Sequence, residues 1–142
     1  MWKTALCLMG LAVAFPVFAQ EQDLRPQVVD YAVQAVTRLR NQLVDPTSFT
    51  LLEVKAFTKV DKHGDTKFLG CIRGVAANGF GAKNQAWFGY HFDDKKKEVE
   101  VGQELGSYSP TGCISRFYSK DWTSYDVTEE VRKDLKPLEG AK

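Results

Sequence analysis

The most regular apolar pattern in the chain predicts one long helix over residues 23–44. Apolar side chains recur there at every third or fourth position, and charged or amide side chains fill the others. Asp23 can cap the first turn, and Pro26 is tolerated there. Asp45-Pro46 ends the helix because the residue before a proline avoids helical dihedral angles. The apolar stripe, which we expect to pack on a sheet, consists of Val28, Val29, Ala32, Val33, Val36, Leu39 and Leu43.

The middle of the chain changes to the two-residue period of β-strands. Strands are predicted over residues 49–60, 66–77 and 85–92, with a short edge strand from residue 98 to 101. Turn-forming residues separate them at 61–65, 78–81 and 93–97, and such short connections favour an antiparallel meander. In the first strand, Leu52, Val54, Ala56 and Val60 alternate with Glu53, Lys55 and Lys59. In the third, Ala86, Phe88, Tyr90 and Phe92 share one face, and Trp87, Gly89 and His91 share the other.

The last third is less regular. Residues 102–112 have the composition of a loop, and residues 113–118 suit either a strand or a short helix. Asp126 and Glu129 have the spacing of a capping box, which predicts a short C-terminal helix. The predicted fold is therefore α+β: an N-terminal amphipathic helix packed on a four- to five-stranded antiparallel meander sheet, with a short C-terminal helix.

The first nineteen residues have the organisation of a secretory signal. Lys3 precedes an uncharged apolar run over residues 5–18, and Val17-Phe18-Ala19 precedes Gln20 as a cleavage site would. The run is shorter than the roughly 20 apolar residues of a membrane span, and no cysteine follows it for lipid attachment. A buried N-terminal helix is the alternative interpretation. We expect a signal peptide at 1–19, one domain at 20–142, a periplasmic or secreted location and no transmembrane segment in the mature chain.

The charge balance argues against nucleic acid as a partner. The chain has 19 basic and 18 acidic residues, and loss of Lys3 with the signal makes the two counts equal. A nucleic-acid-binding domain usually carries a basic patch. The only basic run, Lys95-Lys96-Lys97, follows Asp93-Asp94 and so indicates a solvated turn.

Cysteine usage predicts one disulfide. Of three cysteines, Cys7 lies in the predicted signal, which leaves Cys71 and Cys113 in the mature chain. An even number of cysteines in an exported protein favours a bond between them. Two separate buried thiols are the alternative.

Few residues suggest catalysis. His63 lies in a predicted turn, and His91 with Asp93 and Asp94 could offer metal ligands, but no further histidine or free cysteine stands at ligand spacing. We therefore predict no catalytic residue, no metal and no cofactor. Whether the chain is an enzyme stays open, with the balance against it, because carboxylates at 93–100 could serve a small hydrolase.

Aromatic residues of the C-terminal third are the strongest candidates for binding. Tyrosine, tryptophan and arginine dominate the energetics of protein interfaces, and here they alternate with polar residues. The alternative is that these rings cover the sheet face that the helix leaves bare. The predicted partner-binding residues are Tyr108, Arg116, Tyr118, Trp122 and Tyr125.

Three segments between residues 28 and 101 resemble a loose group of small exported bacterial proteins, often lipoproteins and mostly of unassigned function. They are the helix end Asp45-Pro46-Thr47-Ser48-Phe49, Cys71, and residues 74–81, similar to the group's Val-x-Ala-Lys-Asn-x-Phe-Gly-Gly hairpin segment. This chain has Ala77-Asn78 where Lys-Asn is usual, and it has no lipobox. The resemblance implies the fold more than an activity, since its motifs are a helix stop and a turn.

Together these features predict a non-enzymatic periplasmic or secreted binding protein, for instance an inhibitor or immunity-type partner of another envelope protein. A small hydrolase and a passive structural component of the envelope are the alternatives. The sequence leaves the oligomeric state unknown.

Overall fold

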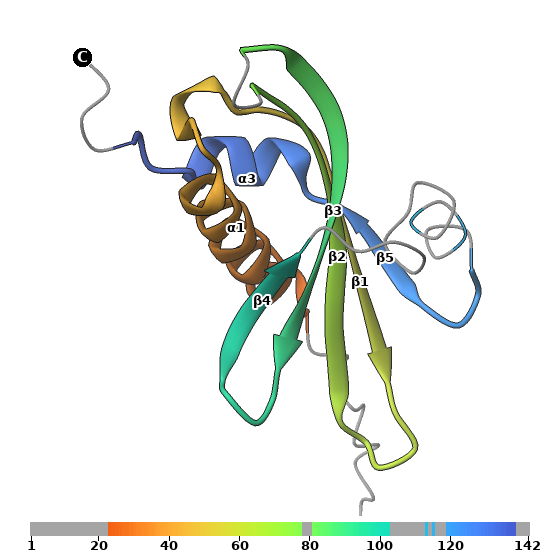
Figure 1. The fold of residues 1–142 in the computed structure, drawn as a ribbon. Helices are drawn as coiled ribbons and strands as arrows, with labels where there is room; N and C mark the ends of the chain where they lie inside the picture. Colours follow the sequence, from red (N-terminus) through yellow and green to blue (C-terminus); the bar gives the residue numbers. More distant parts are fainter. Residues whose placement is uncertain (1–22, 78–80, 103–112, 114, 116–118, 139–142) are drawn as a thin grey trace, which may run out of the picture.

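The computed structural model describes residues 23–77, 81–102, 113, 115 and 119–138. It confirms the predicted α+β class: a helix is followed by a five-stranded antiparallel sheet and a short C-terminal helix (Figure 1). The predicted signal peptide lies outside the described residues. The elements are α1 (Arg25–Gln42), the 3₁₀ turn η1 (Pro46–Ser48), β1 (Thr50–Val60), β2 (Thr66–Ala77), β3 (Lys83–Asp93), β4 (Glu98–Gly102), β5 (Thr123–Asp126) and α3 (Thr128–Asp134).

Helix α1 is two residues shorter at each end than its apolar pattern predicts. Asp23 does act at the start, where its carboxylate accepts the Arg25 N–H at 3.0 Å. At the other end, Leu43 has an extended backbone with ψ of 147°. The buried positions of α1 are Val28, Ala32, Ala35, Val36 and Leu39, so most of the predicted stripe faces the core.

The segment after α1 connects the helix to the far end of β2. The Asp45 carboxylate accepts the N–H and the hydroxyl of Thr47, which holds the chain in the tight turn η1. The Ser48 hydroxyl accepts the Ala77 N–H at 2.9 Å. This Asp-Pro-x-Ser segment is therefore a structural connection in this chain, in keeping with its predicted role as a helix stop.

The sheet has the order β4-β3-β2-β1-β5, and every pairing is antiparallel. Strands β1 to β4 form the predicted meander, with β4 at one edge. The fifth strand differs from a simple meander because it returns to the free edge of β1 and does not continue beyond β4. It was not predicted, since Thr123–Asp126 is short and largely polar.

Hydrogen bonds to β1 also fix where α3 begins. The Val127 N–H donates to the Val54 carbonyl at 3.2 Å, and the Thr128 hydroxyl accepts the Val54 N–H at 2.9 Å. The Asp126 carboxylate accepts the Thr128 N–H at 3.2 Å and so serves the helix start. The helix consequently begins at residue 128, one position later than a capping box with Asp126 as the N-cap predicts.

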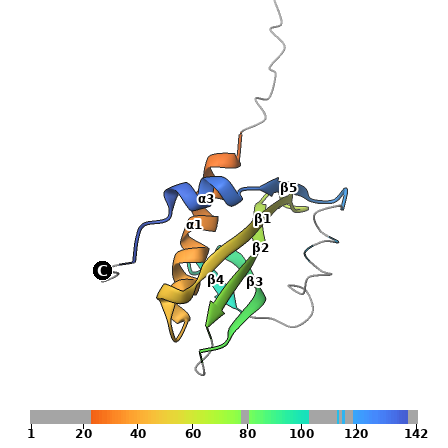
Figure 2. The ribbon, with the colours of Figure 1, turned by 90° about the horizontal axis from the view of Figure 1, so that it is seen from above.

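The main core lies between the sheet and the two helices, which occupy the same side of it (Figures 1 and 2). Buried side chains from α1, β1 to β4 and α3 meet there, among them Ile72, Tyr90 and Val99. The Tyr90 ring lies across Gly70 on the neighbouring strand. A Cβ at residue 70 would stand 2.3 Å from the Tyr90 Cζ, so the close approach requires glycine.

Val60 corrects one detail of the strand pattern. The alternation in β1 places Val60 with the inward residues Val54 and Ala56, yet its side chain is 62% exposed. It pairs with Thr66 at the tip of the β1–β2 hairpin, which extends past the N-terminal start of α1 (Figure 1). Neither α1 nor α3 covers the sheet at that point.

The Tyr90 hydroxyl provides a test of the core. It is buried without a hydrogen-bond partner among the described residues, and this burial raises the pKa of the phenol strongly. A buried polar group without a partner costs about 1–3 kcal/mol. We expect Tyr90→Phe to unfold at an equal or higher free energy, by up to about 1 kcal/mol. Urea unfolding measures this, and a loss above about 1 kcal/mol would show that the hydroxyl has a partner in solution.

Candidate functional site

The face of the sheet opposite α1 carries a disulfide together with charged and aromatic side chains. Because side chains alternate along a strand, this face is read directly from the strand register. We call it the disulfide face, and its residues are Glu53, Lys55, Phe57 and Lys59 of β1, Lys67, Leu69, Cys71 and Arg73 of β2, Trp87, His91 and Asp93 of β3, and Glu100 of β4.

A disulfide lies at the centre of this face. Cys71 and Cys113 are bonded, with their Cα atoms 6.2 Å apart, which confirms the predicted pairing. Both are fully buried together with Phe57, and the half-buried side chains of Leu69, Trp87 and Trp122 pack around them. The sheet therefore has a second, smaller apolar cluster on the side opposite α1 and α3.

Charged side chains border the Trp87 side of this cluster. The Glu53 carboxylate pairs with Lys55 at 2.7 Å and with Arg73 at 2.8 Å. The Arg73 guanidinium lies 5.6 Å from the centre of the Trp87 ring, within reach of a cation–π interaction. The strand register brings these three side chains together, because Glu53 is opposite Arg73 and Arg73 is opposite Trp87.

The Trp122 side is more open. The ammonium of the exposed Lys59 lies 5.6 Å from the centre of the Trp122 ring, and no carboxylate pairs with it in the described ranges. Its register neighbour Lys67 is paired with Asp94 at 2.7 Å, and this hydrogen bond raises the pKa of Lys67. A cation and an indole are thus presented together at this end of the face.

The structure separates the two predicted binding residues that it describes. Trp122 packs beside the disulfide, whereas Tyr125 in β5 packs against the main core on the helix side. Tyr108, Arg116 and Tyr118 lie outside the described residues. Trp122 therefore packs against the disulfide face, whereas Tyr125 packs on the side of the sheet that α1 and α3 cover.

The acidic residues of the β3–β4 hairpin already have partners. The Asp93 carboxylate accepts the N–H groups of Lys96 and Lys95, which lower its pKa. Glu98 pairs with Arg38 of α1 at 2.8 Å, and Glu100 pairs with Lys96. A general acid needs a raised pKa. These contacts favour a structural role for the hairpin carboxylates over the acid–base role of the hydrolase hypothesis.

Three side chains of this hairpin nevertheless converge on one point. The ligand atoms of His91, Asp93 and Glu100 all lie within 4.8 Å of one another. The sequence alone suggested His91, Asp93 and Asp94. Asp94 instead turns to Lys67, and Glu100 takes its place because β4 sets it directly opposite His91. Glu100 was missed because only strand register brings it there.

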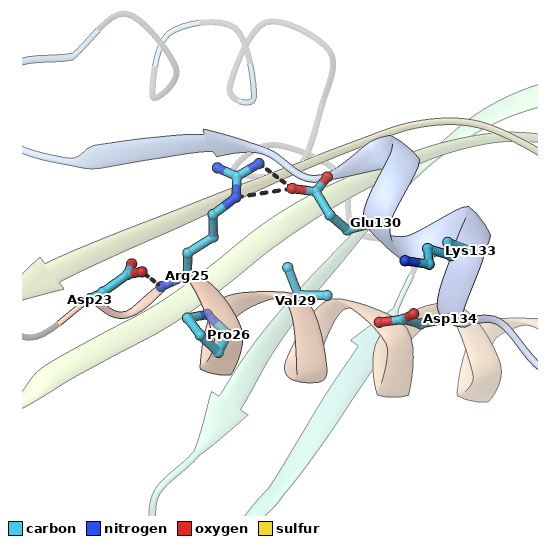
Figure 3. A pocket seen from close by; sticks show the side chains of 7 residues that line it. All are labelled: Asp23, Arg25, Pro26, Val29, Glu130, Lys133 and Asp134. Carbon is cyan, nitrogen blue, oxygen red and sulfur yellow. Dashed lines mark hydrogen bonds and ion pairs between the residues drawn. The ribbon is translucent and has the colours of Figure 1, made fainter.

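A hollow of about 360 Å³ opens between the start of α1 and α3 (Figure 3). Arg25 crosses it to Glu130 and also donates to the Asp126 carbonyl at 3.1 Å, and the pKa of Glu130 is lowered by this arginine. In the described part of the chain, neither a histidine nor a cysteine lines this hollow or the other hollows along α1, β1, β5 and α3. Its charges join α1 to α3.

The described helices include none with the length and apolar character needed to cross a membrane. The disulfide is compatible with an extracellular or periplasmic location, where such bonds persist. Comparison of the chain with protein-family models, with curated proteins and with solved structures finds no match.

Proposed function

We propose that this protein is an exported, non-enzymatic binding protein that contacts another secreted or envelope protein through its disulfide face. The observation that carries the proposal is the pairing of half-buried indoles with cations around a disulfide, on the side of the sheet opposite α1 and α3. Tryptophan, tyrosine and arginine are enriched where interfaces gain most of their energy.

Pre-organisation of the face supports this function. The disulfide fixes Cys113 to the middle of β2, and Trp122 packs against the bonded pair. The Glu53–Arg73 ion pair holds a cation beside Trp87. A surface whose large side chains are already ordered loses less entropy when a partner binds.

Export is part of the proposal. Its support is the signal-like sequence of residues 1–19 together with the disulfide, which an oxidising compartment would form and keep. The partner is then a protein of the same compartment.

Site-specific photo-crosslinking in the native compartment tests the contact surface. A photoreactive phenylalanine analogue at Lys59 would lie on the disulfide face beside Trp122. The same analogue at the exposed Gln34 would lie on α1, on the opposite side of the sheet. We expect one discrete crosslinked protein from position 59 and none from position 34. Equal crosslinking from both positions, or from position 34 alone, would contradict the proposal.

Trp122→Ala should weaken that complex more than it weakens the fold. Its ring is half-buried, so the free energy of unfolding should fall by less than about 3 kcal/mol, the lower value for a fully buried tryptophan. A hot spot should lose about 2 kcal/mol or more of binding energy. Thermal unfolding without a partner and crosslink yield with one measure the two effects. A stability loss of about 3–5 kcal/mol would assign Trp122 to the core and remove it from the contact surface.

A further inference from the structure

We propose that His91, Asp93 and Glu100 form a binding site for one divalent transition-metal ion, with Zn²⁺ as the best-suited ion, at the β3–β4 edge of the disulfide face. The site is independent of the partner-binding function proposed above. It rests on the convergence of one imidazole and two carboxylates from two paired strands.

The backbone fixes the three positions. His91 and Glu100 are register partners across β3 and β4, and Asp93 is two residues beyond His91 on the same face of β3. The distance from His91 Nε2 to Glu100 Oε2 is 3.4 Å. Tetrahedral zinc with bonds of about 2.0–2.1 Å separates its ligand atoms by about 3.4 Å. Two of the three ligands therefore already stand at the separation that the ion requires.

The third ligand is held nearby. Two backbone N–H groups, from Lys95 and Lys96, donate to Asp93 Oδ1 at 2.8 and 3.0 Å and hold this carboxylate in the turn. A ligand that is ordered before the ion arrives costs less to bring into place. All three side chains are half-buried, so the ion could enter from solvent and keep water in its remaining position.

The donor set selects the class of ion. Calcium and magnesium prefer oxygen ligands only, whereas imidazole nitrogen favours zinc, nickel, copper and cobalt. One nitrogen with two carboxylate oxygens therefore suits a transition metal better than an alkaline-earth ion.

The ammonium of Lys96 would compete with a metal ion for the Glu100 carboxylate. It pairs with Glu100 and occupies one oxygen of that ligand. A metal ion must displace this contact or share the carboxylate with it. Removing the ammonium should therefore tighten metal binding, by the two- to fivefold that corresponds roughly to an exposed ion pair.

Titration calorimetry of the untagged protein with ZnCl₂ tests the site. We expect one ion per chain, and at least about tenfold weaker binding in His91→Gln, Asp93→Asn and Glu100→Gln, a loss typical of disrupted metal sites. Lys96→Met should bind more tightly. His63→Gln is the matched control, because His63 lies in the β1–β2 turn near Asp61 and Asp65, and it should leave binding unchanged.

Cobalt gives a second readout that does not depend on heat. Co²⁺ in the site should produce visible ligand-field absorption that His91→Gln removes and His63→Gln keeps, while excess MgCl₂ leaves it unchanged. Circular dichroism confirms that each variant is folded. Absence of Zn²⁺ binding in the unmodified protein, or binding that follows His63 and not His91, would overturn the proposal.

Discussion

The double substitution Cys71→Ser and Cys113→Ser is expected to lower the free energy of unfolding by about 4 kcal/mol. The disulfide joins residues 42 positions apart, and a cross-link that closes a loop of this size restricts the unfolded chain by about that amount. Both sulfur atoms also lie in a fully buried cluster, so hydroxyl groups there add a cost of desolvation.

Urea unfolding of the chain that begins at residue 20, which holds no other cysteine, measures this effect. The matched control is the reduced unmodified protein, which keeps both side chains and loses only the bond. If the oxidised and reduced proteins unfolded at free energies within about 0.5 kcal/mol of each other, the chain-entropy explanation would be wrong.

Phe57→Ala should cost about 3–5 kcal/mol of stability, as truncation of a fully buried phenylalanine usually does. Phe57 is 0% exposed although it lies on the side of β1 that also carries Glu53, Lys55 and Lys59. Its ring is packed with Cys71 and Cys113. Truncation would leave a cavity directly beside the disulfide.

Val60→Ala on the same strand is the control, because its side chain is 62% exposed and should change stability by no more than about 0.5 kcal/mol. Chemical denaturation of both variants decides the matter. If Phe57→Ala lowered the free energy of unfolding by less than about 1 kcal/mol, the disulfide face would hold no second core. Its aromatic side chains would then contribute to the protein only as surface residues.

These two results bear on the proposed function. If the cluster around the disulfide is well packed, it holds the surrounding indoles and cations in a fixed arrangement. A loose centre would leave Trp87 and Trp122 to be ordered by the partner, which reduces the affinity that the same contacts can give.

Local sequence determined the elements with strong periodicity. The three- and four-residue spacing of apolar positions fixed α1 to within two residues, and Asp45-Pro46 ended it. The turn-forming residues on either side gave the bounds of β2 correctly, and alternation separated Tyr90 from His91 on β3. Cysteine pairing was also determined by sequence, since only two cysteines remain once Cys7 is assigned to the signal.

Tertiary structure decided what depends on distant partners. Strand β5 forms because the edge of β1 offers backbone groups for hydrogen bonding. The apolar pattern of its four residues does not predict a strand. The same pairing sends Tyr125 to the helix side, while Trp122, just before the strand, packs by the disulfide. The register of β3 and β4 brings Glu100 to His91 and turns Asp94 away to Lys67. The sequence contains these residue types, but the hydrogen bonds between strands set the register and so determine which side chains come into contact.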